Sequence, residues 1–184
     1  MKIINVLLIS LSFFLLNGEK KMDFGPFSMT TPDNWKYIET RSIDSFVGKI
    51  ALDGKDTLDF DYGYYSSSLN EDLGLITTKD SVFKEVKNEN INDTLNPYVT
   101  KFYAKRDTLN LEKLYKTQYS FESINNLKAK IVTPKKVGIG LTGVYFENIS
   151  TKRKGLRLQI SGYNLSAENQ KSFLKAIKTI TFKD

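Results

Sequence analysis

The chain contains no cysteine and no histidine among its 184 residues. Without cysteine it has no disulfides, no thiolate metal ligands and no thiol nucleophile. Without histidine it lacks the commonest general base and the commonest metal ligand, so Ser-His and Cys-His catalytic pairs are excluded. Carboxylate, lysine, tyrosine and serine side chains remain for any chemistry. We predict no cofactor, no metal site and no assigned catalytic residue.

One long apolar run is present, and it stands at the N-terminus. Residues 3–16 follow a single lysine and contain only asparagine and serine as polar residues, and the charged stretch from Glu19 follows Gly18. This is the layout of a secretory signal peptide, and the run is shorter than the roughly 20 residues that a bilayer crossing needs. We predict a signal peptide over residues 1–18 and a periplasmic or secreted product without a stable membrane span. An uncleaved anchor is the alternative.

Residues 19–184 are the size of one ordinary domain, and no repeat or linker divides them. The net charge is +6, with acidic and basic residues mostly interspersed. Two basic clusters stand out: Lys128, Lys130, Lys135 and Lys136, then Lys152, Arg153, Lys154 and Arg157. On an exported protein such clusters are accessible to anionic lipid or acidic polysaccharide, and we predict no nucleic-acid partner. The simpler interpretation is a solvated loop and strand edge.

Alternation of apolar and polar residues predicts that most of residues 19–184 form β-strands. The clearest unit is a hairpin, with strands at 46–52 and 57–62 around Asp53-Gly54-Lys55-Asp56. Further strands are predicted at 24–31, 82–87, 98–105, 114–121, 128–132, 142–149, 156–163 and 179–182. One helix is predicted from Ser166 to Lys178, with Ser166 as N-cap. We expect one core to bury Trp35, Ile50, Phe60, Phe146, Phe173 and Ile177.

Both ends of the mature chain resemble a known superfamily. The motif Phe27-Ser28-Met29-Thr30-Thr31-Pro32-Asp33-Asn34-Trp35 is similar to the opening of PsbP-like domains, and residues 166–182 resemble the closing helix and strand of that fold. The resemblance implies an α+β fold, with helices packed on an antiparallel β-sheet, and it implies no shared activity. The middle of the chain, at residues 43–48 and 59–63, is similar to uncharacterised exported proteins of Gram-negative bacteria.

The most unusual composition lies at residues 59–68, Asp-Phe-Asp-Tyr-Gly-Tyr-Tyr-Ser-Ser-Ser. On a strand, Asp59 and Asp61 share one face while Phe60 and Tyr62 share the other. This pattern fits a sheet with a wet acidic face and an aromatic core face, a Tyr and Ser recognition loop, or carboxylates that share acid-base work or a hard cation. The candidate ligand-binding residues are Asp59, Asp61, Tyr62, Tyr64, Tyr65 and Ser66.

Four triplets have the form Asp, then Ser or Thr, then an aliphatic residue. Their hydroxyls belong to Thr57, Ser81, Thr94 and Thr108. The triplets fit turn chemistry, in which Asp ends a turn and a β-branched residue starts a strand. They also resemble the O-glycosylation sequon that one large Gram-negative phylum uses in its periplasm.

These observations predict an exported, non-enzymatic binding or accessory module of the bacterial cell envelope, with an envelope protein or a glycan as partner. A carboxylate-dependent hydrolase acting on glycans through Asp59 and Asp61 is one alternative. Neighbours on one strand are a poor pair for it, because the two carboxyl groups of a glycosidase face each other across the scissile bond. A structural envelope protein is the other alternative.

Overall fold

The computed structural model describes residues 18–40, 42–71, 76–78, 102–104 and 115–183. Its largest part is a seven-stranded sheet in the order β3-β4-β5-β11-β10-β9-β8, in which every neighbouring pair is antiparallel. The strands are β3 (Lys36–Glu39), β4 (Phe46–Ala51), β5 (Thr57–Gly63), β8 (Thr117–Ile124), β9 (Leu127–Pro134), β10 (Leu141–Phe146) and β11 (Arg157–Tyr163).

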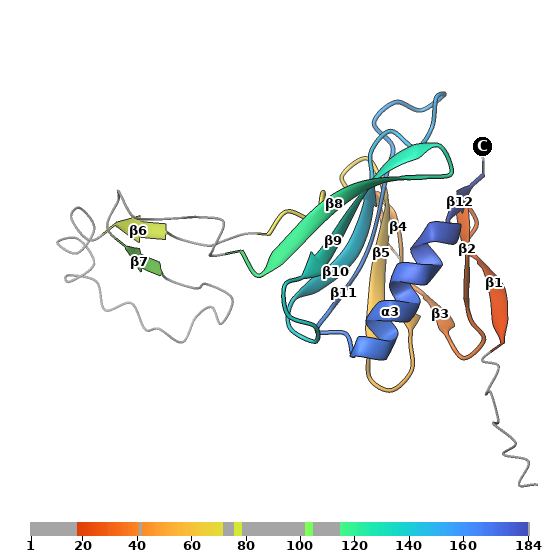
Figure 1. Ribbon diagram of the computed structural model, residues 1–184. Coiled ribbons are helices and arrows are strands. Elements are labelled where there is room, and N and C mark those ends of the chain that lie inside the picture. The colour runs from red at the N-terminus through yellow and green to blue at the C-terminus, as the bar shows by residue number, and fades with distance from the viewer. Residues whose placement is uncertain (1–17, 41, 72–75, 79–101, 105–114, 184) are drawn as a thin grey trace, which may run out of the picture.

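A second layer covers one face of this sheet (Figure 1). It consists of a three-stranded antiparallel sheet, β1 (Glu19–Asp23), β2 (Phe27–Pro32) and β12 (Thr181–Phe182), and of the helix α3 (Ala167–Ala176). The 3-10 helix η2 (Ile177–Thr179) joins α3 to β12. Two further strands, β6 (Ile76–Thr78) and β7 (Phe102–Ala104), pair with each other in parallel.

Aromatic side chains fill the space between the two layers. The Phe60 ring of β5 lies 5.3 Å from the Phe27 ring of β2 and 5.5 Å from the Phe46 ring of β4, measured between centroids. Phe146 on β10 lies 5.2 Å from Phe182 on β12. The six side chains that the sequence placed in one core are all buried in it: Trp35, Ile50, Phe60, Phe146, Phe173 and Ile177. That prediction is confirmed.

The predicted α+β class is wrong, because the structure is mainly β. Within the described ranges, α3 with η2 is the only helical segment, and strands dominate the rest. The period-two alternation had indicated strands along most of the mature chain, whereas the additional packed helices were expected from the resemblance alone. The C-terminal helix itself lies where the sequence predicted it. The hydroxyl of Ser166 accepts a hydrogen bond from the amide of Asn169 and caps α3.

Most predicted strands are present with shifted ends. The hairpin of β4 and β5 matches its prediction closely, while the strand expected at 24–31 begins only at Phe27. The sequence did not predict β1, whose residues pair with β2 across the turn at Gly25. The strand predicted at 82–87 lies outside the described residues, and the one predicted at 98–105 is described only at β7.

Candidate binding site

The face of the large sheet that points away from α3 is called the open face here. On β5, Leu58 and Phe60 are buried on the core side, whereas Asp59 and Asp61 lie on the open face. The Asp59 carboxylate pairs with Lys49 of β4 at 3.1 Å, and both side chains are more than half exposed. Solvent weakens such a pair, so it contributes little to stability.

Asp59 and Asp61 lack the geometry of a hydrolytic pair. They are next-but-one neighbours on a single strand, so both side chains leave the sheet in the same direction. A glycosidase needs its two carboxyl groups on opposite sides of the bond that breaks. Among the described residues, moreover, the ammonium of Lys49 already lies against Asp59.

Tyr62 belongs to the core side and not to the open face. Its ring stacks on Phe27, with 6.3 Å between centroids. Burial raises the pKa of the Tyr62 hydroxyl, an effect that the positive charge of Arg153 opposes and that Tyr64 reinforces. The sequence grouped Tyr62 with Asp59 and Asp61 as ligand-binding residues, but the strand separates it from both.

The chain leaves β5 through Tyr64, Tyr65 and Ser66. The Tyr65 side chain is 81% exposed and that of Tyr64 is 48% exposed, so both rings are accessible. Ser66 is buried, and its hydroxyl donates to the carbonyl of Asp61 at 2.9 Å. Ser66 therefore stabilises the turn after β5 and does not face solvent.

Residues 64–71 form a strap that crosses the open face from the end of β5 toward the start of β8. In the middle of the strap, Leu69 packs over Gly143 of β10 and joins a small apolar cluster with Val132, Leu141 and Tyr145. A Cβ atom at position 143 would lie 2.7 Å from the Leu69 Cδ1 atom and 2.9 Å from the Ile160 carbonyl oxygen, and the backbone contact in particular favours glycine there. The strap and the sheet thus share a second, smaller core.

Glu71 is the last residue of the strap, and both oxygens of its carboxylate accept hydrogen bonds. The backbone amides of Lys116 and Thr117 and the Thr117 hydroxyl donate to it at 2.7 to 2.9 Å. Burial alone would raise the pKa of Glu71, but the hydrogen bonds from Thr117 and Lys116 outweigh it and hold the pKa below its ordinary value. Glu71 therefore ties residue 71 to residue 116 across the intervening chain.

Beside the strap, β8 and β9 carry a patch of aromatic and lysine side chains on the open face. Tyr119 and Phe121 of β8 are 66% and 55% exposed, and their ring centroids lie 5.7 Å apart. The Lys128 ammonium lies 4.2 Å from the Phe121 centroid, and that of Lys130 lies 5.1 Å from the Tyr119 centroid. These distances are those of cation–π contacts. We call these four residues the aromatic–lysine patch.

The patch borders two hollows. The larger, about 660 Å³ in volume, lies between the strap and β8 and is lined among others by Leu69, Tyr115, Tyr119 and Lys130. The smaller, about 430 Å³, lies toward β10 and is lined among others by Phe121, Lys128, Tyr145 and Glu147. Lys130 lines both.

Lys130 has a structural role in addition to its place in the patch. Its ammonium donates to the Ser68 carbonyl at 3.0 Å and to Asn70 Oδ1 at 2.6 Å, so it holds the strap on β9. Burial lowers its pKa. Lys128 is exposed and makes no ion pair within the described part of the chain. It is therefore the cation of the patch best placed to meet an anion.

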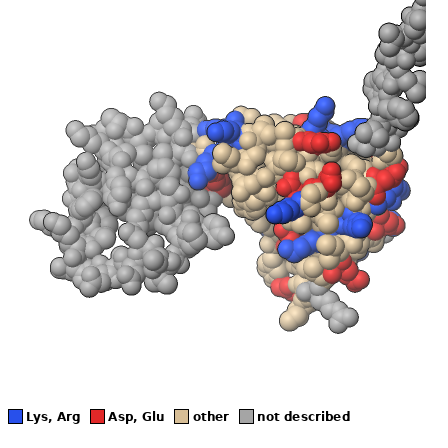
Figure 2. All heavy atoms as spheres, turned by 90° about the horizontal axis from the view of Figure 1, so that it is seen from below, with Lys and Arg blue, Asp and Glu red and all other residues tan. Residues whose placement is uncertain are grey.

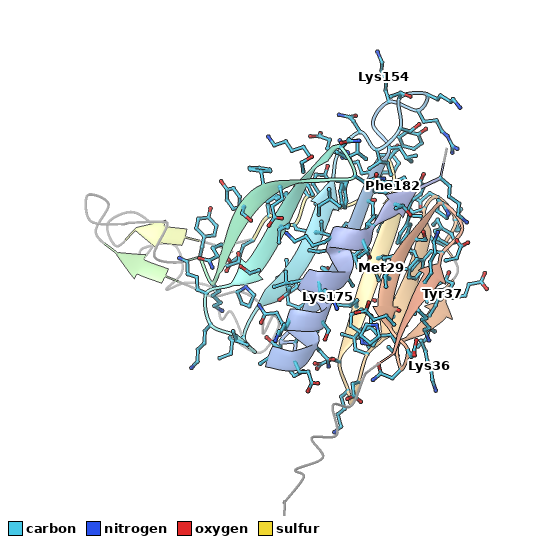
Figure 3. The ribbon with its side chains drawn as sticks, turned by 45° about the vertical axis from the view of Figure 1, so that its right-hand side comes forward. Met29, Lys36, Tyr37, Lys154, Lys175 and Phe182 are labelled. Carbon is cyan, nitrogen blue, oxygen red and sulfur yellow. The ribbon has the colours of Figure 1, made fainter. Side chains whose placement is uncertain are left out.

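The second basic cluster lies elsewhere. Lys152, Arg153 and Lys154 are exposed on the loop between β10 and β11, and Lys154 stands at the outer tip of that loop (Figure 3). Acidic and basic side chains also alternate over the lower end of the molecule (Figure 2). These three loop residues fit the simple interpretation of a solvated loop, whereas Arg157, the fourth of the cluster, is half-buried on the inner strand β11.

Of the four candidate glycosylation sites, the structure describes only Thr57; Ser81, Thr94 and Thr108 lie outside the described residues. Thr57 is exposed at the start of β5. The preceding Asp56 accepts hydrogen bonds from the Ser166 amide and the Asn169 side chain, at 2.8 and 2.7 Å. The Asp of this triplet thus fixes the hairpin turn to the start of α3, a contact that the sequence pattern did not predict.

Within the described ranges, no three His, Cys, Asp or Glu side chains come together as a metal site would require. None of the helices described there is long and apolar enough to cross a membrane.

Sequence reasoning named Lys128 and Lys130 but did not pair them with Tyr119 and Phe121. The signal that would have found the patch is the alternation Tyr115-x-Thr117-x-Tyr119-x-Phe121, followed by Asn125-Asn126 and by Lys128-x-Lys130. Read as a hairpin, this sequence puts the rings and the ammonium groups on one face.

Comparison with protein-family models, with curated proteins and with solved structures finds no match to the chain. The resemblance to PsbP-like domains stays a prediction.

Proposed function

We propose that the protein is an exported, non-catalytic binding module of the bacterial cell envelope, and that its aromatic–lysine patch binds an acidic glycan. The observation that carries the proposal is the exposure of Tyr119 and Phe121 beside the ammonium groups of Lys128 and Lys130. Exposed aromatic rings on a rigid sheet offer contact area with little conformational entropy to lose.

An acidic polysaccharide matches this combination better than a neutral one. Its C–H faces can pack on the rings, while its carboxylates meet Lys128 on the rim of the smaller hollow. Binding by such contacts needs no general acid or base, in agreement with the arrangement of Asp59 and Asp61. Because the charges are exposed, affinity should fall as salt rises.

The test uses a soluble polyuronate as probe and dextran of similar length as its neutral counterpart, with binding measured by isothermal titration calorimetry at low salt. The wild-type protein should bind the polyuronate and not dextran. The double variant Tyr119→Ala/Phe121→Ala should lose at least tenfold in affinity, and Lys128→Gln should lose affinity and salt dependence together. Tyr163→Ala, which removes another exposed ring of the large sheet, is the matched control and should bind normally.

Two outcomes would contradict the proposal. If Tyr64→Ala/Tyr65→Ala abolishes polyuronate binding while the Tyr119 and Phe121 variant does not, the site is at the start of the strap. If the protein hydrolyses a polysaccharide and Asp59→Asn or Asp61→Asn stops it, the protein is an enzyme.

A further inference from the structure

The two edge strands of the large sheet differ in how well they are protected against pairing with another strand. At one edge, β3 is four residues long and carries Lys36 and Glu39. At the other edge, β8 is eight residues long, and its only charged residue is Glu122. Residues 118–123 of β8 are all exposed. Natural edge strands usually carry charged side chains, proline or a bulge that discourages pairing. β8 has no lysine, proline or bulge, and its one charge, Glu122, is paired with Lys178.

The pairing with β9 and the hydrogen bond of Thr117 show which backbone groups of β8 point outward. Thr117 lies opposite Pro134 of β9, which has no amide hydrogen, and the Thr117 amide donates instead to Glu71. In an antiparallel pair, inward and outward groups alternate along the strand. The amides and carbonyls of Tyr119, Phe121 and Ser123 therefore also face the outer edge, where no described strand pairs with them.

We propose that a second copy of this chain pairs with β8 edge to edge, antiparallel, about a twofold axis at Phe121. Glu71 occupies the Thr117 amide, so the uncapped part of the edge is residues 118–124, whose midpoint is Phe121. Phe121 then lies opposite Phe121 of the partner subunit. Tyr119 lies opposite Ser123 of the partner subunit, and every outward amide of these residues meets a carbonyl.

The charges of β8 are compatible with a second copy as the paired strand. In this register Glu122 faces Ser120 of the partner subunit, so no like charges are opposed. Glu122 is in addition paired with Lys178 of its own chain. In the symmetric pairing both copies form the same backbone hydrogen bonds, as the two sides of an isologous interface must. One strand pair buries a small area, so the dimer should be weak and dependent on concentration.

The pairing does not rest on the glycan proposal, although it would place the two aromatic–lysine patches side by side on one continuous open face. Its test exploits the absence of cysteine from the chain. In the proposed register the two Phe121 Cα atoms lie about 5.5 Å apart, which a disulfide can span. The full mature chain with Phe121→Cys should form a disulfide-linked dimer under mild oxidation. Tyr163→Cys, at an exposed position on β11, should not.

Sedimentation of the unoxidised wild-type protein provides the second measurement. Its average mass should rise with concentration toward that of a dimer, and Phe121→Lys should abolish the rise, because two lysines would meet at the axis beside Lys130 of each copy. Circular dichroism establishes that the variant is folded. A wild-type protein that remains monomeric at millimolar concentration would overturn the proposal. A dimer that persists in Phe121→Lys and cross-links through position 163 would overturn it too.

Discussion

At the scale of single residues, the Phe173 side chain packs α3 against the core between the sheets. It is fully buried, and it belongs to the same cluster as Trp35, Phe60 and Phe146. Gly48 shows how tightly this cluster is packed, since a Cβ atom there would lie 2.5 Å from the Phe60 ring. Core side chains in so close a packing cannot be shortened without leaving a cavity.

We expect Phe173→Ala to lower the free energy of unfolding by about 3 to 5 kcal/mol, because it removes a buried ring and leaves a void. Urea denaturation of both proteins measures the difference. Lys171→Ala, an exposed change on the same helix, is the control and should cost less than about 0.5 kcal/mol. A loss for Phe173→Ala as small as the control's would show that α3 does not anchor the fold.

The lowered pKa of Glu71 leads us to predict that the free energy of unfolding depends on pH. Its pKa is lower in the folded chain than its ordinary value of 4.5. The unfolded chain therefore binds the proton more readily, and protonation favours unfolding. The contribution of Glu71 should be complete above about pH 4.5 and should disappear as pH falls through the lowered folded pKa.

The check compares melting temperatures of the wild type and Glu71→Gln from pH 3 to pH 7. The wild type should melt higher at pH 7, and the two curves should converge below the ordinary pKa of 4.5. Asp56 behaves similarly: burial would raise its pKa, but the hydrogen bonds from Asn169 and Ser166 outweigh burial and lower it. Its effect is the same in both proteins, so it cancels when their melting temperatures are subtracted. Curves that stay parallel would mean that Glu71 does not act through its charge.

At the scale of elements, the turn between β8 and β9 sets the register of the hairpin that carries the patch. Asn125 and Asn126 have φ angles of 49° and 62°, and Ile124 lies opposite Leu127. A two-residue loop with both residues in the left-handed region is the type I′ turn that suits twisted strands. Asparagine tolerates this conformation and glycine adopts it freely.

We therefore expect Asn126→Gly to leave the protein as stable as the wild type or slightly more so, and Asn126→Ala to lower stability by about 1 kcal/mol. Thermal unfolding of both variants checks this. The two replacements differ only in a methyl group, so the difference between them is the strain of the backbone less the smaller unfolded-state entropy of alanine. Equal melting temperatures would indicate that the turn adopts another conformation.

At the scale of the whole molecule, the described fold is compatible with the predicted removal of residues 1–18. Strand β1 begins at Glu19, and the Gly18 carbonyl accepts a hydrogen bond from the Asp33 amide. A chain that starts at Glu19 would keep all of β1 and would lose the hydrogen bond to the Gly18 carbonyl, whereas a start at Met22 would remove most of the strand.

We predict that the mature protein begins near Glu19 and fractionates outside the cytoplasm. N-terminal sequencing of periplasmic or secreted material measures both. Full-length chain recovered from the cytosol would refute the prediction. A full-length chain in the membrane fraction would favour the uncleaved anchor.

The sequence by itself determined the local structure. Alternation separated Asp59 and Asp61 from Phe60 and Tyr62, since neighbouring side chains on any strand point to opposite faces. Ser166 marked the start of α3, since a hydroxyl there satisfies a free amide of the first turn. The absence of cysteine and histidine excluded whole classes of chemistry. Each of these inferences depends on residues that are close together in the chain.

Only the tertiary structure decided which distant segments meet. It placed the Glu71 carboxylate on the amides of Lys116 and Thr117, and Leu69 on Gly143. It also assembled a mainly β architecture where the resemblance had implied α+β. Such contacts depend on the order of the strands and on the path of the strap. The spacing of apolar residues along the sequence encodes neither. Strands of similar pattern can pair in many orders, and burial of the whole core selects among them.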